Sequence, residues 1–249
     1  MKRTERPFTQ IPRPLLAGFV ILLGLQILVH QSTLRQTGVS YKPLSTPFAA
    51  SVYRGLSMGS EQLFSYLLVM RLQLHDNQAG KHVRYSQLDY ERLVNWLDAI
   101  YQLNPRSEYP MMLASRVYSQ TRDKTRLRIM LEYIDRTFMQ NPQLHWRRLA
   151  EATVIAKHQL GDLQLALQMA QKLSSQPASV KMPSWARDMQ FILLGDMNEF
   201  ETAITIIVAL LQSEAVNDPD EARFLKEKLL YFQQKLSELQ QDSQFQSPN

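Results

Sequence analysis

Apolar residues recur at helical spacing four times in the second half of the chain. Within each series they stand at offsets 0, 3, 4, 7, 10 and 11, with one slip each in the middle two, at Thr137 and Ser174. Such offsets place one apolar stripe on an α-helix. The starts lie 37, 36 and 37 residues apart, and a fixed period of about 20–50 residues indicates stacked repeats. The sequence therefore predicts an all-α helical-hairpin solenoid, a fold that presents binding surface. The four series begin at Tyr90, Leu127, Leu163 and Phe200.

Each repeat is expected to hold two helices, because a proline follows every one of the first three series. Pro105 and Pro142 stand fifteen residues beyond the starts of their series, and Pro177 stands fourteen beyond its own. Each break leaves room for one more helix before the next series. Each of these additional helices is the first of its repeat, and they are expected over Pro110–Gln120, Leu144–Gln159 and Pro183–Leu194. The residues at offset seven, which are expected to be buried between helices, are Leu97, Ile134, Ala170 and Ile207.

The expected organisation has five parts. A basic flank (1–13) precedes an apolar segment (14–30), and a linker (31–59) rich in Ser, Thr, Gly and Pro follows without a sustained helical period. The repeat domain (60–240) starts with a helix after Ser60. It ends with a helix that has Asp218 as its N-cap and Pro219 at its first position, and that runs to about Leu239. The tail (241–249) is expected to be disordered.

The apolar segment predicts an uncleaved signal anchor. Leu15–Val29 has one polar residue, Gln26; this is short for a span, which needs about 17–25 residues, and fits a signal-peptide core of about 7–15. No pair of small residues for cleavage follows at once, which favours the anchor over a cleaved signal and a soluble secreted protein. Four basic residues precede the segment, so the N-terminus should be cytoplasmic and the repeat domain periplasmic, at a bacterial inner membrane.

Charge and composition exclude several function classes. Residues 1–13 carry a net charge of +3 out of +5 for the whole chain, so the rest is nearly neutral and nucleic acid is disfavoured. The chain has no Cys, which excludes disulfides, thiolate metal sites and cysteine nucleophiles. No His-x3-His or Glu-x2-His pair places two ligands on one helical face. We therefore expect no metal, no cofactor and no small-molecule substrate.

Several segments resemble the tetratricopeptide-repeat family. Tyr90-Glu-Arg-Leu with Trp96, Ile100 and Leu103-Asn-Pro105 is similar to the second helix of that repeat. Ala114 with Tyr118, and the Leu160-Gly-Asp162 turn before Ala166, are similar to its first helix and inter-helix turn. The resemblance covers about residues 60–214, although the period is 36–37 where the family has about 34. It implies superhelical stacking and the binding of a partner peptide on a concave face lined by first helices.

A basic cluster from Arg116 to Lys157 holds nine Lys or Arg residues against four acids. Four of the nine could project from first helices into the groove and hold an acidic peptide or a carboxylate. Alternatively, the cluster lies on a solvated outer face, paired with Asp123, Asp135 and Glu151. As surface residues, two of the four, Arg147 and Arg148, should tolerate charge reversal within about 0.5 kcal/mol per site. The four candidate binding residues are Arg116, Arg147, Arg148 and Lys157.

The function expected from the sequence is docking rather than catalysis. The sequence offers no set of nucleophile, base and orienting group, so we expect no enzyme. We expect a membrane-anchored extracytoplasmic protein that binds an integral membrane or envelope protein as a scaffold, assembly factor or accessory subunit. The alternative is an enzyme or enzyme regulator that acts in the solenoid groove. The three tryptophans, Trp96, Trp146 and Trp185, fall in successive hairpins and are expected to pack between repeats.

Overall fold

A computed structural model describes residues 13–35, 43–78, 81–82, 84–213, 216 and 218–245. The chain divides into two units, Met1–Lys42 with Gln78–Lys81, and Pro43–Asn77 with His82–Asn249. Apart from the two-residue strands β1 (Asn77–Gln78) and β2 (Lys81–His82), which pair with each other, the regular structure of the described residues is helical. The predicted all-α class is confirmed.

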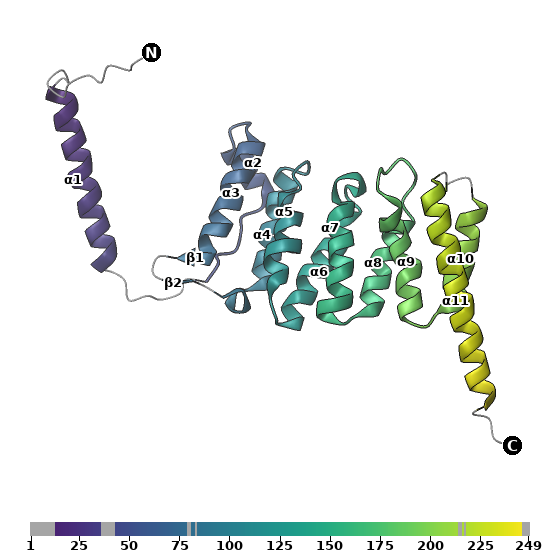
Figure 1. Cartoon of the computed structure of the whole chain (residues 1–249). Coiled ribbons are helices and arrows are strands. Elements are labelled where there is room, and N and C mark those ends of the chain that lie inside the picture. The colour runs from purple at the N-terminus through teal and green to yellow at the C-terminus, as the bar shows by residue number, and fades with distance from the viewer. Residues whose placement is uncertain are drawn as a thin grey trace, which may run out of the picture. The chain divides into compact units, whose positions relative to one another are not determined.

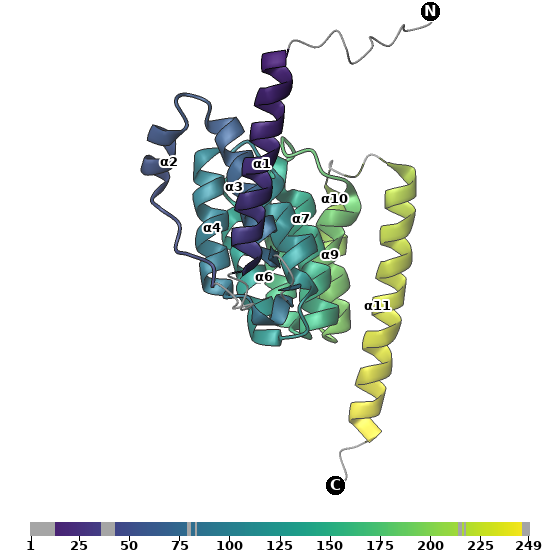
Figure 2. The same ribbon diagram turned by 90° about the vertical axis from the view of Figure 1, so that its left-hand side faces the viewer.

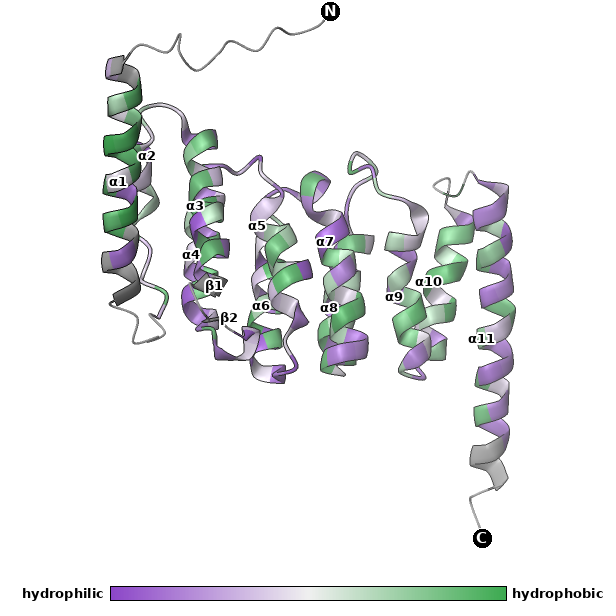
Figure 3. Ribbon diagram, turned by 60° about the vertical axis from the view of Figure 1, so that its left-hand side comes forward, coloured by the Kyte–Doolittle hydropathy of each residue, from purple (hydrophilic) through white to green (hydrophobic). Residues whose placement is uncertain are grey.

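The first unit contains helix α1 (Arg13–Arg35). Its 23 residues cover the predicted anchor segment and continue five residues beyond it. At about 1.5 Å per residue, such a helix is about 34 Å long. Apolar residues follow one another along most of it (Figure 3). By length and hydropathy taken together, none of the helices in the described part of the chain qualifies as a membrane span.

The second unit is a row of helices in which successive members pack against one another (Figure 1). Two helices of the row continue into π-helical turns, Leu113–Val117 after α5 and Ala156–Leu160 after α7. Short 3-10 turns cover Tyr85–Gln87 and Tyr118–Gln120. The helices are α2 (Ala50–Leu56), α3 (Glu61–Asp76), α4 (Tyr90–Leu103), α5 (Tyr109–Met112), α6 (Lys124–Phe138), α7 (Pro142–Ile155), α8 (Leu163–Ser174), α9 (Ser184–Asp196), α10 (Phe200–Gln212) and α11 (Pro219–Phe245).

The predicted repeat register is confirmed by the helices of the second unit. Helices α4, α8 and α10 begin at the first residues of their series, and α6 begins three residues before its own. The side chains at offset seven, Leu97, Ile134, Ala170 and Ile207, are all 0% exposed. One apolar stripe per helix therefore carries the packing of this unit, as the spacing predicts.

Side-chain caps explain why several of these helices begin where they do. The Asp89 carboxylate accepts a hydrogen bond from the backbone N–H of Arg92, and the Asp162 carboxylate accepts one from Leu165. Asp123 caps α6 and Asn141 caps α7 in the same way. Each cap satisfies a backbone donor that the first helical turn leaves without a partner.

Part of the segment expected to be a linker packs on the repeat unit. Helix α2 lies in this segment, and its Tyr53 ring packs 6.2 Å from the Trp96 ring of α4. The indole N–H of Trp96 donates to the Ser45 carbonyl at 2.7 Å, and Arg92 donates to the Leu44 carbonyl at 2.7 Å. The sequence gives no sign of α2 because seven residues are too few for a helical period.

Two further helices differ from the predicted ranges. The first helix expected over Pro110–Gln120 is α-helical only to Met112, where a π-helical turn takes over. Helix α11 begins at Pro219 as predicted, but it continues to Phe245, beyond the expected end at about Leu239 and into the expected tail. Its C-terminal turns extend past the ends of the neighbouring helices in two views (Figure 1, Figure 2).

Helix α11 is held by a close approach to the end of α9. A Cβ atom added at Gly195 would lie 2.5 Å from the ring of Phe232, so only glycine fits under this ring. The Phe232 ring also lies 5.8 Å from the ring of Phe200 at the start of α10. Leu225 lies two turns before Phe232 on the same face of α11, and it is 0% exposed in the same apolar cluster.

An acidic pair lies where α11 meets α9, and it makes stability depend on pH. Asp188 of α9 is buried, and burial together with the charge of Glu221 raises its pKa from 3.8 to about 7. Burial also raises the pKa of Glu221, with the charge of Asp218 adding to the effect and Arg187 opposing it. The folded protein therefore holds protons that the unfolded chain releases between about pH 4 and pH 7, so this pair lowers stability as pH rises through that window.

We expect Asp188→Asn to remove most of this pH dependence. The variant should melt higher than the wild type at pH 8, and the two should converge near pH 4, because both then carry a neutral side chain at this position. Thermal melts followed by circular dichroism between pH 4 and pH 8 measure the effect. Asp220→Asn is the matched control, because Asp220 is exposed beside the same helix start. Equal pH slopes for wild type and Asp188→Asn would contradict the prediction.

Candidate protein-binding groove

Helices α7 and α9 enclose a surface hollow of about 510 Å³, called here the α7–α9 groove. Helix α7 supplies two rows of side chains at a spacing of four residues, which places each row along one face of the helix. The N-terminal end of α9 supplies the opposite wall. The lining residues are Trp146, Arg147, Ala150, Glu151, Val154, Pro183 and Trp185.

Two tryptophans and one arginine shape this groove. The rings of Trp146 and Trp185 meet edge to face, with centroids 5.9 Å apart and planes at 64°. Trp146 is 9% exposed and forms the floor, whereas Trp185 is 53% exposed and forms the rim. The Arg147 guanidinium lies 5.1 Å from the centre of the Trp146 ring, in cation–π contact. Exposed tryptophan and arginine over an apolar floor is the composition found at the energetic centres of protein interfaces.

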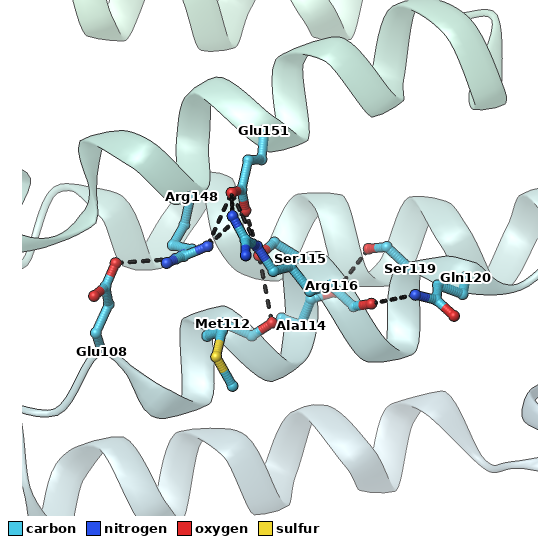
Figure 4. A network of polar contacts seen from close by, with 9 residues as sticks. All are labelled: Glu108, Met112, Ala114, Ser115, Arg116, Ser119, Gln120, Arg148 and Glu151. Atoms are coloured by element: carbon cyan, nitrogen blue, oxygen red, sulfur yellow. Dashed lines mark hydrogen bonds and ion pairs between the residues drawn. The ribbon is translucent and has the colours of Figure 1, made fainter.

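A network of charges is centred on Glu151, one of the residues that line the groove (Figure 4). Arg148 donates from Nη1 to both carboxylate oxygens of Glu151, at 2.9 and 2.8 Å, and from Nε to Glu108 at 3.0 Å. Arg116 of the preceding hairpin reaches the same carboxylate at 2.5 and 3.1 Å, and the Ser115 hydroxyl donates to it at 2.9 Å. The network ties the π-helical turn after α5 to α7 and fixes the α7 wall of the groove.

The pKa of Glu151 shows which effect dominates in this network. Partial burial by itself raises the pKa of a carboxyl group. The hydrogen bonds that Glu151 accepts from Arg116, Arg148 and Ser115 outweigh that effect, and its pKa is lowered from the ordinary value of 4.5. Glu151 is therefore ionised at neutral pH with its charge compensated, and it presents little free negative charge to the groove.

The structure brings three of the four predicted binding residues to this groove or into contact with its lining. Arg147 lines the groove, while Arg116 and Arg148 both bond to Glu151, which also lines it. Lys157 lies further along, in the π-helical turn after α7, where its amine is 2.6 Å from Asp196 of α9. Of the four, only Arg147 makes no hydrogen bond or ion pair within the described residues, and so its charge is available to a partner.

Arg148 is not the surface residue that the sequence suggested. Its side chain is 10% exposed and contacts two carboxylates, so charge reversal there would bury a third negative charge beside them. The expectation that charge reversal at Arg148 changes the stability by no more than about 0.5 kcal/mol is therefore withdrawn. The physical reason is Glu108, which lies 40 residues earlier in the sequence and reaches Arg148 only through the packing of hairpins.

Several other charges in and around the basic cluster pair across hairpins. The pairs join residues 34 to 39 positions apart, which is about the repeat period. Exposed ion pairs contribute little stability, about 0–1 kcal/mol each, but opposite charges at this spacing favour the correct register of the stack. These pairs are Arg128–Asp162, Arg136–Asp98, Lys157–Asp196 and Lys172–Asp135.

The sequence analysis found the arginines but missed the tryptophan pair. All three tryptophans were expected to pack between repeats, and Trp96, which is 1% exposed, does so. Trp185 instead exposes more than half of its surface beside Trp146. The available signal was the neighbouring pair Trp146-Arg147, in which an aromatic ring stands next to one of the four predicted binding residues.

The histidine of α7 belongs to the core and not to the groove. His145 is 0% exposed, and its Nε2 lies 3.1 Å from the Tyr101 hydroxyl of α4. Burial, with the charge of Arg148 adding and that of Glu108 opposing, lowers its pKa to about 4, so the ring is neutral at physiological pH. Within the described ranges, no three His, Cys, Asp or Glu side chains are grouped so that they could hold a metal ion.

The groove is thus an open, largely apolar site with one available positive charge. Its rim and floor are aromatic, its wall is fixed by a charge network, and Arg147 stands at its edge. Comparison with known proteins finds no family model, no curated protein and no solved structure that matches the chain.

Proposed function

We propose that the protein is a membrane-anchored, tetratricopeptide-like docking protein that binds a segment of another envelope protein in the α7–α9 groove. The observation that carries this proposal is the half-exposed Trp185, which stands edge to face on Trp146 beside the unpaired Arg147. A large exposed aromatic side chain fixed by its neighbours loses little entropy on binding and buries much apolar area. Such a residue is suited to recognition.

The groove favours a partner segment with an apolar or aromatic side chain next to an acidic one. A side chain that enters the hollow of about 510 Å³ would stack against Trp185 and lie over Ala150. A carboxylate beside it would meet the guanidinium of Arg147, whose fork can bind both carboxylate oxygens. Around the groove, three arginines stand against two glutamates, so the local charge also favours an acidic segment.

Binding is better supported than catalysis at this site. The acid that lines the groove, Glu151, already accepts hydrogen bonds from two arginines and a serine, and its lowered pKa makes it a poor base. The remaining lining side chains are aromatic, aliphatic or, in Arg147, permanently charged. A role as scaffold, assembly factor or accessory subunit of a membrane complex uses these features directly.

Helix α1 is proposed to anchor the protein. It is 23 residues long, its large apolar side chains are exposed, and four basic residues precede its apolar part in the sequence. Basic residues are retained on the cytoplasmic side of a span. This arrangement supports an N-terminus in the cytoplasm and a repeat domain on the far side of a bacterial inner membrane, within reach of envelope proteins.

Two single substitutions test the groove. We expect Trp185→Ala and Arg147→Glu each to reduce recovery of a stoichiometric membrane-protein partner by 10-fold or more, when the full chain is purified in mild detergent. Truncating a central aromatic or arginine of an interface typically costs 2 kcal/mol or more, about 30-fold in affinity. Raising the salt concentration should weaken recovery by the wild type, because it screens Arg147.

Matched controls separate recognition from folding in this experiment. Arg122→Glu reverses an exposed charge of the same basic cluster outside the groove, and Leu230→Ala truncates a 67% exposed side chain on α11. Both should leave recovery unchanged, and all four variants should keep the wild-type melting temperature within a few degrees. Recovery that is equal for Trp185→Ala, Arg147→Glu and the controls would rule out the groove as the docking site.

A further inference from the structure

Helix α3 has two apolar faces, and only one of them is covered. Leu68, Val69 and Leu72 are at most 5% exposed and pack against the repeat unit. The opposite side carries a second stripe at offsets 0, 4, 7 and 11, which falls on one face of the helix. Its side chains are 50–65% exposed. The stripe consists of Leu63, Leu67, Met70 and Leu74.

The turn before α3 adds two exposed apolar side chains next to the N-terminal end of this helix. Met58 is 96% exposed, and Leu56 beside it is 56% exposed. Met58 has φ 48° and Gly59 has φ 86°, so a residue with a side chain adopts the left-handed region in order to make this turn. That conformation is unfavourable for residues other than Gly, Asn and Asp. The fold thus presents a methionine in this turn at some local cost. These two residues and the stripe together, Leu56, Met58, Leu63, Leu67, Met70 and Leu74, are called the apolar edge.

We propose that the apolar edge lies in the interface of the bilayer that holds α1. This inference rests on the anchoring part of the proposed function. Helix α2 begins 15 residues after the last residue of α1, and a chain of that length spans at most about 50 Å. A tether of this kind turns membrane contact into an intramolecular event at high effective concentration. On a freely diffusing protein, an exposed apolar surface of this kind would promote aggregation. On an anchored protein it stays close to the bilayer, which can bury it.

The charges near the edge fit contact with apolar chains more than attraction to anionic headgroups. Arg54 of α2 donates to the Gln102 carbonyl at 2.9 Å and lies 3.7 Å from Glu61, so its charge is compensated. Arg71 lies over the Trp96 ring at 5.3 Å, on the repeat unit and off the stripe. Attachment through the edge should therefore depend on burial of leucine and methionine side chains and should resist salt.

A bilayer fits the shape of the edge better than a second helix does. One helix laid along α3 would cover the stripe of Leu63, Leu67, Met70 and Leu74, but Met58 stands beyond the end of the helix on a separate turn. A fluid interface needs no complementary shape and can receive stripe and turn together. This favours a lipid surface over a second copy of the chain.

The absence of Cys from the sequence allows a clean test with single-cysteine labels in the full chain. The labelled variants are Met58→Cys and Leu67→Cys in the edge, Ile21→Cys in α1, and Met139→Cys as a control. Met139 is 56% exposed in the turn between α6 and α7. Each variant carries an environment-sensitive fluorophore and is reconstituted into phosphatidylethanolamine–phosphatidylglycerol vesicles with and without brominated lipids. The bromine is near the headgroup end of the acyl chain for the labels at positions 58, 67 and 139, and near the methyl end for the label at position 21, which lies near the middle of the proposed span.

We expect brominated lipid to quench the labels at positions 58 and 67 at least three times as strongly as the label at position 139, in low and in high salt. The label at position 21 reports the anchor separately. Quenching at 21 without quenching at 58 and 67 beyond the control would overturn the edge inference and leave the anchor standing. An unquenched label at 21 would overturn the anchor. Oxidative dimerisation of the unlabelled Leu67→Cys variant, with no lipid quenching of the labelled one, would assign the edge to a second copy and overturn the inference as well.

Discussion

Leu97→Ala is expected to lower the free energy of unfolding by about 2–5 kcal/mol, as large-to-small changes in well-packed cores do. Leu97 is 0% exposed in α4, and α4 packs against α2, α3, α5 and α6. The cavity therefore opens in a helix that is packed against four other elements, which limits how far α4 can shift to fill it. Because folded domains are stable by only about 5–15 kcal/mol, a loss of this size removes a large fraction of the total.

Thermal and urea unfolding of the full chain, followed by circular dichroism, measures this effect. Leu230→Ala makes the same truncation at a 67% exposed position of α11 and should change the stability by no more than about 0.5 kcal/mol. Ile134→Ala tests the equivalent position in α6, which is also 0% exposed. If Leu97→Ala and Ile134→Ala behave like Leu230→Ala, offset seven does not mark the core and the repeat register is wrong.

The two core variants should also differ in how unfolding proceeds. In a linear array each repeat is stabilised mainly by its neighbours. A destabilised repeat in the middle therefore lets the two ends unfold separately, whereas a destabilised repeat near one end leaves a single, shorter unit that unfolds cooperatively. Leu97 belongs to an early hairpin and Ile134 to a central one. We therefore expect a broader transition for Ile134→Ala than for Leu97→Ala at similar loss of stability.

The parts of the fold that could be predicted are those set by local periodicity. The stripe of α10, from Phe200 to Leu211, lies within twelve consecutive residues and can be recognised without the rest of the chain. The start of α11 is likewise marked by Asp218 and Pro219 within two residues. Such signals are local because the helical period and the cap both act over one to three turns.

The parts that could not be predicted depend on which hairpins become neighbours. Arg147 and Arg148 are adjacent and chemically identical, yet one is exposed on an indole ring and the other is buried between two carboxylates. What separates them is about 100° of rotation on α7 and the position of Glu108 in the preceding hairpin. Trp185 is exposed for a related reason, since its place depends on how the start of α9 meets α7. Neither fact is carried by spacing within one segment.

Arg148→Met is expected to destabilise the protein by about 2–4 kcal/mol, because it leaves Glu108 and Glu151 without their shared partner. Removing one side of a buried charge pair costs about 3–5 kcal/mol, and the lower range applies here because both carboxylates are partly exposed. Methionine keeps much of the apolar stem of arginine, so the loss reports charge and hydrogen bonding more than packing. Unfolding in urea at pH 7 measures it.

Arg116→Met is the matched control for this network. Arg116 bonds to the same carboxylate, but its side chain is 62% exposed, so its loss should cost no more than about 1 kcal/mol. The two substitutions should not be additive, because both arginines act on Glu151. Adding Glu108→Gln to Arg148→Met should recover part of the stability, since it removes the carboxylate whose ion pair with Arg148 is lost, whereas Glu151 keeps Arg116 and Ser115.

The penalty of Arg148→Met should shrink as the solution is acidified. The pKa of Glu151 lies below its ordinary value of 4.5 in the folded protein, so the network stabilises the fold above that pH and loses its contribution as Glu151 is protonated. The wild type should therefore lose more stability than Arg148→Met as the pH falls from about 4.5 through the lowered pKa of Glu151, and the two unfolding curves should approach each other there. A penalty that stays constant as the pH falls would mean that Arg148 stabilises the protein through packing alone. The charges bonded to Glu151 would then not hold the α7 wall of the groove in place.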